Sequence, residues 1–394
     1  MQIPKKRILV WLSWGVDSAV SAYLLKDAGY DVACGFMINY LDEDHPENCP
    51  TLADLEEAKG VAKYLDLPLY TFDYREEYER RIVEYIYREY EAGRTPNPDV
   101  YCNNLVKFDL FLEEALALGY DMIATGHYAC ISIRHPELAK DPEDLKHGFF
   151  VPQNDGNIDF EPWTLNFSLF KWLDPSKDQS YFLSRLSSFQ LSKSIFPIGW
   201  LLKSEVREIA KKAWLPNAER RDSQWLCFIG KVSMKEFLER RIPKKPWNII
   251  DTSGSVLGRH EWAYSYTIGQ RKGIEIGWWP ALFVISKDMK TNTITVGTED
   301  DLRLFSSACR LIDWIGEVPE EGRKYAAKIR YRQEDQEIIV NYELWIADTS
   351  EKSEKIPKFT IYNLQFITPQ RAITPGQVCV IYDDDRVLGS GIIV

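Results

Sequence analysis

The sequence predicts an α/β protein in which a parallel sheet with helices on both faces is followed by a small linker domain and a C-terminal β-barrel. Residues 7–126 alternate short apolar runs with amphipathic runs, the pattern of a mainly parallel sheet with helical crossovers. From about residue 247 the strands become short and turns frequent, which is typical of an all-β region. At 394 residues, the chain is long enough for two or three domains.

The first third of the chain supplies the elements of the predicted sheet. The predicted strands are Arg7–Leu12, Asp31–Met37, Leu67–Phe72 and Tyr120–Thr125, and the predicted helices are Ser18–Ala28, Thr51–Leu65, Arg75–Glu91 and Leu105–Leu118. Ligands of such sheets bind beyond the carboxyl ends of the strands. The loop at residues 13–18, Met37 and Gly126 all fall at predicted strand ends, so they could share one pocket, although Met37 fits a core equally well.

The remaining chain divides into a helical part and a β-rich part. Residues 131–165 form an irregular polar insertion, and two further helices are predicted at Ser187–Lys193 and Lys203–Ala213. Period-two runs at Thr293–Val296 and Lys328–Tyr331 predict strands, and the barrel closes with strands Val378–Asp383 and Val387–Val394. We therefore predict three domains, at residues 1–205, 206–282 and 283–394.

Composition indicates a cytoplasmic protein with no tightly bound metal and no membrane association. No run reaches the roughly 18 apolar residues of a membrane span, and the Lys-rich start of the chain lacks an apolar signal core. The seven cysteines are odd in number, widely spaced and free of any Cys-x-x-Cys pair, which disfavours a disulfide framework or a zinc site. A net charge of −11 disfavours indiscriminate nucleic-acid binding, and the local basic clusters are commonly just solvated faces.

Ser13-Trp14-Gly15-Val16-Asp17-Ser18 is the stretch around which the chain is organised. It follows an apolar strand and opens a helix, and a helix N-terminus suits a phosphate because its N–H groups are unpaired. The loop lacks the Lys of a Walker motif. It is similar to the Ser-Gly-Gly-x-Asp-Ser loop of enzymes that split ATP into AMP and pyrophosphate, with Trp14 in place of the second residue. An ordinary strand-to-helix turn is the competing interpretation.

Two cysteines 125 positions apart are candidates for thiol chemistry. Cys102 follows a proline-bounded loop and precedes the helix predicted from residue 105, and a helix N-terminus is expected to lower a thiol pKa. Cys227 lies in a polar-then-apolar segment that could be a flexible arm. For Cys102, the alternative is a buried, inert thiol.

Several motifs together resemble the bacterial tRNA-specific 2-thiouridylases, members of the PP-loop ATP pyrophosphatase superfamily. The resemblance covers nearly the whole chain except residues 131–165. Its motifs are the loop at 13–18, Ala92–Asp99 with Cys102-Asn103, Ala124–Tyr128, Lys177–Leu183, Asp222-Ser223 with Cys227–Gly230, and Tyr266–Gly273. The first domain is then expected to have the adenine nucleotide alpha hydrolase-like fold.

The resemblance implies an ATP-dependent reaction on the wobble uridine of tRNA, with Mg²⁺ bound transiently alongside ATP. Cys227 would carry a persulfide, Cys102 would be the nucleophile that releases its sulfur with a transient disulfide, and Asp99 would assist as acid or base. The implied ATP-binding residues are Trp11, Leu12, Ser13, Trp14, Gly15, Val16, Asp17, Ser18, Met37 and Gly126. The implied tRNA-binding residues are Asn97, Pro98, Asp99, His127, Lys177, Asp178, Gln179, Arg330, Tyr331 and Gln377. The implied partners are the anticodon stem-loop of tRNA and a persulfide-delivering relay protein or cysteine desulfurase.

Tryptophan occupies positions where the family typically has glycine or another small or turn residue. These positions are 11, 14, 172, 200, 214, 225, 247, 262, 278 and 279. Glycine serves where φ is positive or where backbone approaches a ligand, so an indole is a poor substitute. We hypothesise that the gene uses UGA for glycine and that the printed sequence reads it as tryptophan; intact Trp14 and Trp225 in a mass spectrum of the native protein would refute this.

Two other functions compete with tRNA thiolation. One is an adenylating ligase similar to argininosuccinate or GMP synthetase, which shares the loop but has no use for the Cys102 and Cys227 pair. The other is a non-catalytic RNA-binding protein that kept the barrel and lost ATP binding through Trp14. ATP-to-AMP turnover with cognate tRNA separates the second from an enzyme.

Overall fold

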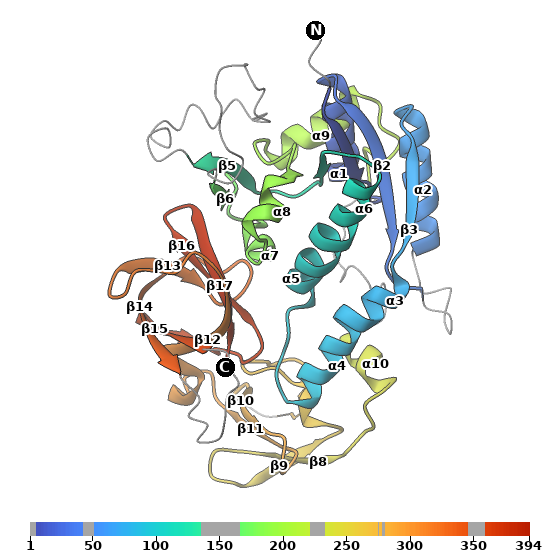
Figure 1. The fold of residues 1–394 in the computed structure, drawn as a ribbon. Coiled ribbons are helices and arrows are strands. Elements are labelled where there is room, and N and C mark those ends of the chain that lie inside the picture. Colours follow the sequence, from blue (N-terminus) through green and yellow to red (C-terminus); the bar gives the residue numbers. More distant parts are fainter. Residues whose placement is uncertain are drawn as a thin grey trace, which may run out of the picture. The chain divides into compact units, whose positions relative to one another are not determined.

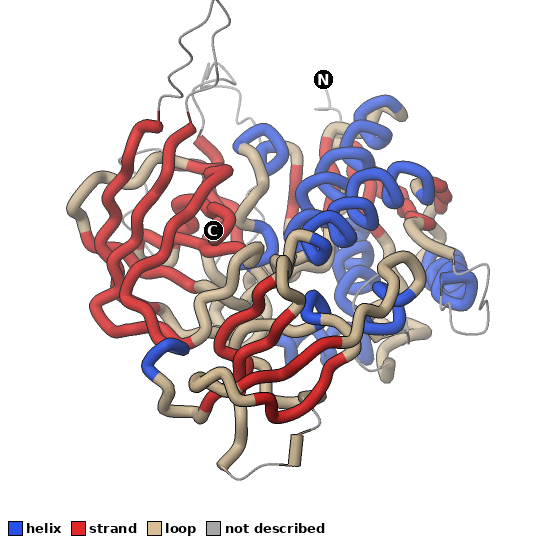
Figure 2. Tube along the Cα trace, turned by 90° about the horizontal axis from the view of Figure 1, so that it is seen from below, coloured by secondary structure: helices blue, strands red, loops and turns tan. Residues whose placement is uncertain are grey.

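The computed structural model describes residues 5–41, 51–134, 166–220, 233–274, 276–277, 280–345 and 359–394, in two compact units. Unit 1 comprises residues 1–81, 99–232 and 385–387, and unit 2 comprises residues 82–98, 233–384 and 388–394. Figure 1 shows the elements along the chain and Figure 2 shows their secondary structure from below. The boundaries at residues 205 and 282 stay predictions.

Unit 1 contains the predicted parallel sheet, so this part of the expected fold class is confirmed. The strands are β1 (Arg7–Trp11), β2 (Asp31–Ile38), β3 (Leu69–Asp73), β4 (Met122–Ala124) and β7 (Ser194–Ile195), in the order β3-β2-β1-β4-β7. All four pairings are parallel. The short β7 was not expected from the sequence, because two residues carry no periodic signal.

Helices cover both faces of this sheet. Those that follow the first strands are α1 (Val16–Asp27), α2 (Thr51–Tyr64) and α3 (Arg75–Tyr78), and π-helical η2 (Glu79–Val83) continues α3. Those later in the chain are α5 (Pro98–Cys102), π-helical η3 (Asn103–Leu110), α6 (Phe111–Ala117), α7 (Ser180–Leu183), α8 (Ser188–Ser192) and α9 (Lys203–Lys212).

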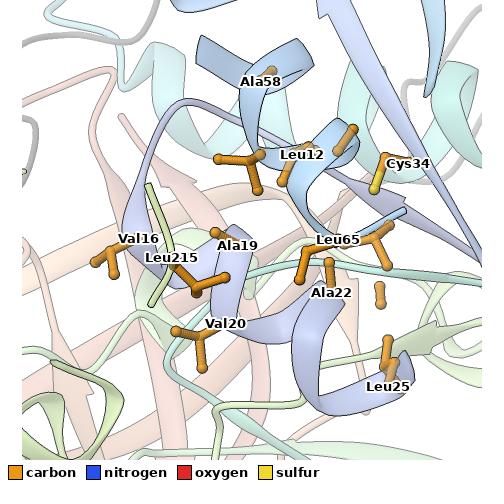
Figure 3. Close-up of a cluster of buried hydrophobic side chains, with 14 of the residues drawn as sticks. Leu12, Val16, Ala19, Val20, Ala22, Leu25, Cys34, Ala58, Leu65 and Leu215 are labelled. Carbon is orange, nitrogen blue, oxygen red and sulfur yellow. The ribbon is translucent and has the colours of Figure 1, made fainter. Parts of the chain in front are cut away.

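Two adjacent residues of β2 show the two faces, because neighbouring side chains of a strand point to opposite sides. Cys34 belongs to a buried cluster that α1, α2 and α9 supply, part of which Figure 3 shows. Gly35 instead faces Phe111 of α6, and a Cβ built there would lie 2.5 Å from that ring. A side chain at residue 35 would therefore push α6 off the sheet.

Unit 2 is built mainly of β-structure, as predicted. It begins with α4 (Glu84–Glu91) and α10 (Met234–Glu239). A four-stranded sheet follows, in the order β10-β11-β8-β9, from β8 (Trp247–Ile250), β9 (Val256–His260), β10 (Phe283–Asp288) and β11 (Thr293–Gly297). The hairpin of β5 (Cys130–Arg134) and β6 (Asn166–Phe170) belongs instead to unit 1, where it precedes α7 in the chain, and the residues between its strands lie outside the described part.

Six antiparallel strands form the closed C-terminal barrel, which confirms the rest of the predicted fold class. They are β12 (Phe305–Gly316), β13 (Lys324–Lys328), β14 (Gln336–Trp345), β15 (Phe359–Arg371), β16 (Val378–Asp383) and β17 (Arg386–Ile393). Their order is β12-β15-β14-β13-β16-β17, and β12 pairs again with β17. The predicted strand Lys328–Tyr331 is wrong, since β13 ends at Lys328 and Arg332 turns the chain at φ +63°.

Candidate nucleotide and thiol site

Two serine hydroxyls close the loop between β1 and α1. The Ser13 N–H donates to Ser18 Oγ at 3.1 Å, and the two hydroxyl oxygens lie 3.0 Å apart. The Gly15 N–H donates to Ser13 Oγ at 3.2 Å, with Gly15 extended at φ −76° and ψ 151° just before α1. The loop thus gathers hydroxyl and N–H donors at the start of a 12-residue helix, which is the donor set that a phosphate requires.

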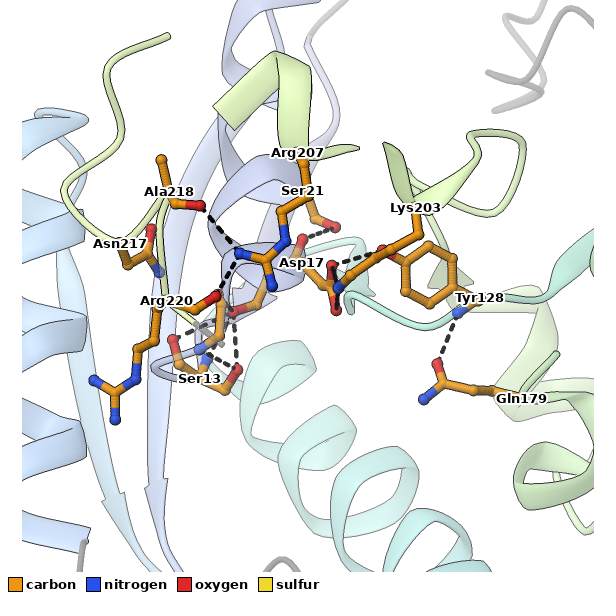
Figure 4. A network of polar contacts seen from close by, with 12 residues as sticks. Ser13, Asp17, Ser21, Tyr128, Gln179, Lys203, Arg207, Asn217, Ala218 and Arg220 are labelled. Atoms are coloured by element: carbon orange, nitrogen blue, oxygen red, sulfur yellow. Dashed lines mark hydrogen bonds and ion pairs between the residues drawn. The ribbon is translucent and has the colours of Figure 1, made fainter. Parts of the chain in front are cut away.

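A polar network connects this loop to three later segments of unit 1, at Tyr128, Gln179 and Lys203 (Figure 4). The Asp17 carboxylate accepts hydrogen bonds from Tyr128 Oη at 2.6 Å and from Lys203 Nζ at 2.7 and 2.9 Å. Gln179 Oε1 in turn accepts the Tyr128 N–H at 2.8 Å. Gln179, predicted to contact tRNA, therefore lies one residue away from the carboxylate of the nucleotide loop.

Trp14 is half-buried and held from outside the loop. Its indole lies 4.2 Å from the Arg220 guanidinium carbon, and its carbonyl accepts from Asn217 Nδ2 at 3.1 Å. Arg220 also pairs with Asp54 at 3.2 Å, yet burial raises the pKa of Asp54 to about 6. The indole is therefore accommodated by a cation–π contact and a backbone hydrogen bond.

Gly126 and Met37 lie at the carboxyl edge of the sheet. A Cβ at Gly126 would lie 2.7 Å from the Ser18 N atom and 2.8 Å from the Asp17 carbonyl carbon, so the segment after β4 touches the first turn of α1. Only glycine allows this approach. Met37 and Leu12 are buried core side chains, at 5% and 0% exposure.

Cys102 lies inside a continuous helical segment, not before one. α5 begins at Pro98 and runs directly into η3 and α6, because proline is tolerated at the first position of a helix. Cys102 ends α5 with helical angles of φ −60° and ψ −43°, and it is a buried thiol without a disulfide. The expected helix N-terminus at Cys102 is therefore wrong, and with it the argument for a lowered thiol pKa. Cys227 lies outside the described residues.

Three ionisable side chains gather near the end of β1. The Lys107 ammonium lies 4.2 Å from the Trp11 ring centroid, and the His127 ring lies 6.4 Å from that ring. Burial, and then the Lys107 charge, hold the pKa of His127 well below its usual range. Burial raises the pKa of Asp99, which the Lys107 charge partly opposes. His127 is thus a neutral imidazole, with Nδ1 2.7 Å from Thr125 Oγ1.

The predicted tRNA contacts at residues 177–179 belong to a tight turn before α7. The buried Asp178 accepts from the Trp172 N–H at 3.1 Å, and from the N–H and hydroxyl of Ser180 at 3.0 and 2.9 Å. Lys177 is half-buried, and its N–H donates to the Asp174 carbonyl at 3.0 Å. Asp178 shapes the turn that presents its neighbours.

In unit 2, Gln377 holds the segment that leads to the predicted base-binding residues Asn97 and Pro98. Its Nε2 donates to the carbonyls of Thr95 and Pro96 at 2.7 and 3.2 Å. Gly376 has φ +90°, and a Cβ there would lie 2.9 Å from the Thr95 N atom.

The other predicted unit 2 contacts lie just after β13. Arg330 is exposed and donates to the Arg371 carbonyl, and the Tyr331 ring is covered by the Arg332 guanidinium at 5.3 Å.

Sequence reasoning missed Lys107 and Lys203. Lys107 carried a signal, because Phe111 and Ala115 follow it at helical spacing and all three are buried. A lysine on the apolar face of a helix is unusual. Lys203 carried none, since its partner Asp17 is 186 positions away.

The tryptophans at positions where the resembled family typically has glycine differ in how well the fold accommodates them. Trp214 follows α9 with φ +52° and is 81% exposed, in the left-handed conformation that usually belongs to glycine at a helix end. The buried Trp172 and Trp262 have indole N–H groups with no hydrogen-bond partner. Trp314 in the barrel, by contrast, donates to the Glu317 carbonyl at 3.2 Å and packs 4.8 Å from Tyr362.

The described residues contain neither a membrane-spanning helix nor a candidate metal site. None of their helices combines the length and apolar composition needed to cross a bilayer. Nor do they contain a group of three or more His, Cys, Asp or Glu side chains suited to a metal ion.

Comparison with protein families assigns a domain to each part of the chain. Residues 6–231 match a tRNA methyl transferase HUP domain, residues 235–298 a tRNA methyl transferase PRC-barrel domain, and residues 308–393 an aminomethyltransferase beta-barrel domain. Among solved structures, NMN synthetase from Francisella tularensis aligns with a TM-score of 0.32 and 14% identity over 60% of this chain and 77% of that one, too low to support an argument.

Curated relatives match the chain from end to end. The tRNA-specific 2-thiouridylase MnmA of Delftia acidovorans is 41% identical over 99% of this chain and 98% of its own length. The protein of the same name from Thiobacillus denitrificans is 41% identical over 98% and 99%, and that from Nitrosomonas eutropha is 42% identical over 99% and 98%.

Proposed function

The chain belongs to the tRNA-specific 2-thiouridylase family, and we propose from this premise that it replaces the 2-oxygen of the wobble uridine of tRNA with sulfur, using ATP. The observation that carries the proposal is a contact within unit 1. The helical segment that bears Asp99 and Cys102 packs against the segment after β4, where the Phe108 and His127 ring centroids lie 5.7 Å apart, and the neighbouring Gly126 touches the first turn of α1. This contact brings a thiol-bearing helix beside a nucleotide-type loop, as activation and sulfur transfer at one carbon require.

The residues around the loop fit the phosphates of ATP. Ser13, Gly15 and Ser18 supply hydroxyl and N–H donors at the start of α1, and Gly126 keeps side-chain bulk away from that turn. Residues 11–18, Met37 and Gly126 would form the nucleotide site, and Mg²⁺ would enter with ATP to offset phosphate charge.

The proposed reaction has two steps at the uridine C2 atom. In the first, the 2-oxygen attacks the α-phosphate and pyrophosphate leaves, so the oxygen becomes part of an adenylate. In the second, the terminal sulfur of a Cys227 persulfide attacks C2 and AMP leaves with that oxygen. The Cys102 thiolate then attacks the Cys227 sulfur, which breaks the S–S bond, frees the thiouridine and leaves a Cys102–Cys227 disulfide for an external dithiol to reduce.

The tRNA would be held by residues of both units. Asn97, Pro98 and Asp99 would contact a flipped-out uridine, because a stacked base shields its 2-oxygen. The remaining contacts would come from His127, Lys177, Asp178, Gln179, Arg330, Tyr331 and Gln377. Burial of Asp99 raises its pKa, which is the direction that favours a carboxyl group able to donate a proton. A persulfide-delivering relay protein or cysteine desulfurase would load Cys227, and the protein would act in the cytoplasm.

Nucleoside analysis of tRNA incubated with the protein, ATP and a persulfide donor, a cysteine desulfurase with cysteine, tests the proposal. We expect 2-thiouridine at the wobble position, dependent on ATP, with Cys102→Ser and Cys227→Ser each reducing it at least a hundredfold. Cys34→Ser is the matched control, because Cys34 is a buried thiol of the sheet core. ATP-to-AMP turnover without thiouridine would favour an adenylating ligase, and tRNA binding without turnover would favour an RNA-binding protein.

A further inference from the structure

Lys107 is a buried cation for which the described chain supplies no counter-ion. It is 7% exposed, and no carboxylate among the described residues lies within ion-pair distance of its ammonium. The ammonium lies over the face of the Trp11 ring, 4.2 Å from the ring centroid. A ring face offsets only part of the cost of burying an ammonium, and buried charges are normally paired.

Two other buried charged side chains, Glu89 and Lys328, are paired. The carboxylate of the buried Glu89 accepts hydrogen bonds from Arg94 Nε at 2.6 Å and from Arg94 Nη2 at 2.7 Å. Lys328, also 7% exposed, lies 3.6 Å from the Asp335 carboxylate and 5.3 Å from the Tyr382 ring centroid. The missing carboxylate is therefore a property of the Lys107 site and not of buried lysines in this protein.

The surroundings of Lys107 favour an anion. Asp99 is close enough to interact electrostatically but forms no ion pair with it, and His127 is neutral at physiological pH. Trp11 ends β1 and stands two residues before Ser13, whose hydroxyl belongs to the nucleotide-type loop. Lys107 also lies in the eight-residue π-helical η3, and π-helical turns occur frequently at functional sites.

We propose that Lys107 is a phosphate-binding residue that receives the α-phosphate of ATP and then of the adenylated uridine. This inference rests on the proposed function. A lysine ammonium suits the task because it is a compact point charge that binds phosphate oxygens. The phosphate would act as the counter-ion that the described chain lacks, so it would be bound more tightly than the loop alone allows.

The test compares Lys107→Met with Lys328→Met in the full-length protein. Calorimetry with a non-hydrolysable ATP analogue is expected to show at least thirtyfold weaker binding for Lys107→Met and unchanged binding for Lys328→Met. Lys107→Arg keeps the charge and should restore most of the affinity. Binding of the tRNA alone, measured by gel shift, should change less than threefold.

A thermal melt without nucleotide separates this role from a structural one. If Lys107 awaits a phosphate, Lys107→Met removes an uncompensated buried charge, and its melting temperature should equal or exceed that of the unmodified protein. Analogue affinity unchanged by Lys107→Met would overturn the proposal, as would a melting temperature lowered by several degrees. If the unmodified protein binds the analogue in a Lys107-dependent way but makes no thiouridine, the proposed function fails while the phosphate site stands.

Discussion

Two buried lysines, one in each unit, lie against aromatic rings but differ in their charge partners. Lys328 at the end of β13 has the Asp335 carboxylate 3.6 Å away, whereas Lys107 in η3 has the Trp11 ring and no carboxylate within ion-pair distance among the described residues. In unit 2, the buried lysine charge is balanced by a carboxylate of the protein itself. In unit 1, the unbalanced charge lies beside a phosphate-type loop, which suggests that a ligand completes it. Four predictions test this contrast, from the largest expected effect to the smallest.

Arg94→Met tests whether buried charges in unit 2 depend on their partners. It leaves the Glu89 carboxylate, whose side chain is 9% exposed, without the bidentate guanidinium that binds it. We expect the free energy of unfolding in urea to fall by about 3 kcal/mol. Arg75→Met is the matched control. Its partner Asp73 is 51% exposed, so loss of this ion pair should lower the free energy of unfolding by at most about 1 kcal/mol. Equal effects would contradict the contrast.

Asp335→Asn makes the barrel lysine resemble Lys107. It removes the carboxylate from Lys328 but keeps the side-chain shape, so a buried ammonium loses its counter-ion. We expect a loss of about 1–2 kcal/mol in urea unfolding, because Asp335 is 42% exposed and water replaces part of the interaction. ATP analogue binding should stay unchanged, and weaker binding would mean that the two lysines are not separate in function.

The low pKa of His127 predicts that acid weakens the fold. Its folded pKa lies below the unfolded value of about 6.5, so the unfolded chain binds more protons and stability falls as pH drops through 6.5. His127→Asn should flatten this slope by up to about 1.4 kcal/mol per pH unit. The comparison must be with the unmodified protein, because the raised pKa of Asp54 contributes the opposite slope.

His260→Asn is the matched control in unit 2 for this pH dependence. Burial also lowers the pKa of His260, but its hydrogen bond to the Asn292 carbonyl opposes that shift, so the slope should flatten less. If the stability of the His127→Asn variant depended on pH as steeply as that of the unmodified protein, the low pKa assigned to His127 would be contradicted.

Trp214→Gly is expected to raise stability slightly. A bulky residue at φ +52° costs about 1 kcal/mol relative to glycine, and the 81% exposed indole contributes little packing. Trp314→Gly in strand β12 should instead lower stability, because glycine is unfavourable within strands and this indole packs against Tyr362 and donates to the Glu317 carbonyl. Melting temperatures that shift in the same direction for both would count against a glycine-type position at 214.

Much of the fold could be predicted because its signals are local. The apolar runs of β1 and β2 and the periodicity of α1 and α2 predicted their bounds within two residues. The start of α5 at Pro98 was missed, since two nearby prolines suggested a loop, although the first helical position tolerates proline. The strand at Lys328–Tyr331 failed because alternation alone does not reveal the left-handed turn at Arg332.

The candidate site was predictable only as a set of motifs. The 13–18 loop and Gly126 do meet at the first turn of α1, as strand ends in a parallel sheet must. Lys107 could have been noticed as a lysine on the apolar face of a helix, but its contact with Trp11 is far away in the chain. Lys203 depends on Asp17, 186 positions away, so no local pattern indicates its role. Likewise, the bonds from Gln377 to the carbonyls of residues 95 and 96 span about 280 positions.

Isotope tracing of the uridine 2-oxygen tests the central claim most directly. A tRNA carrying ¹⁸O at C2 of the wobble uridine is incubated with the protein, ATP and a persulfide donor, a cysteine desulfurase with cysteine, and the products are analysed by mass spectrometry. If the oxygen attacks the α-phosphate, each thiouridine formed yields one AMP carrying a single ¹⁸O and an unlabelled pyrophosphate. Label that remains in the tRNA or appears in water, or ADP as the nucleotide product, would contradict the proposed adenylation.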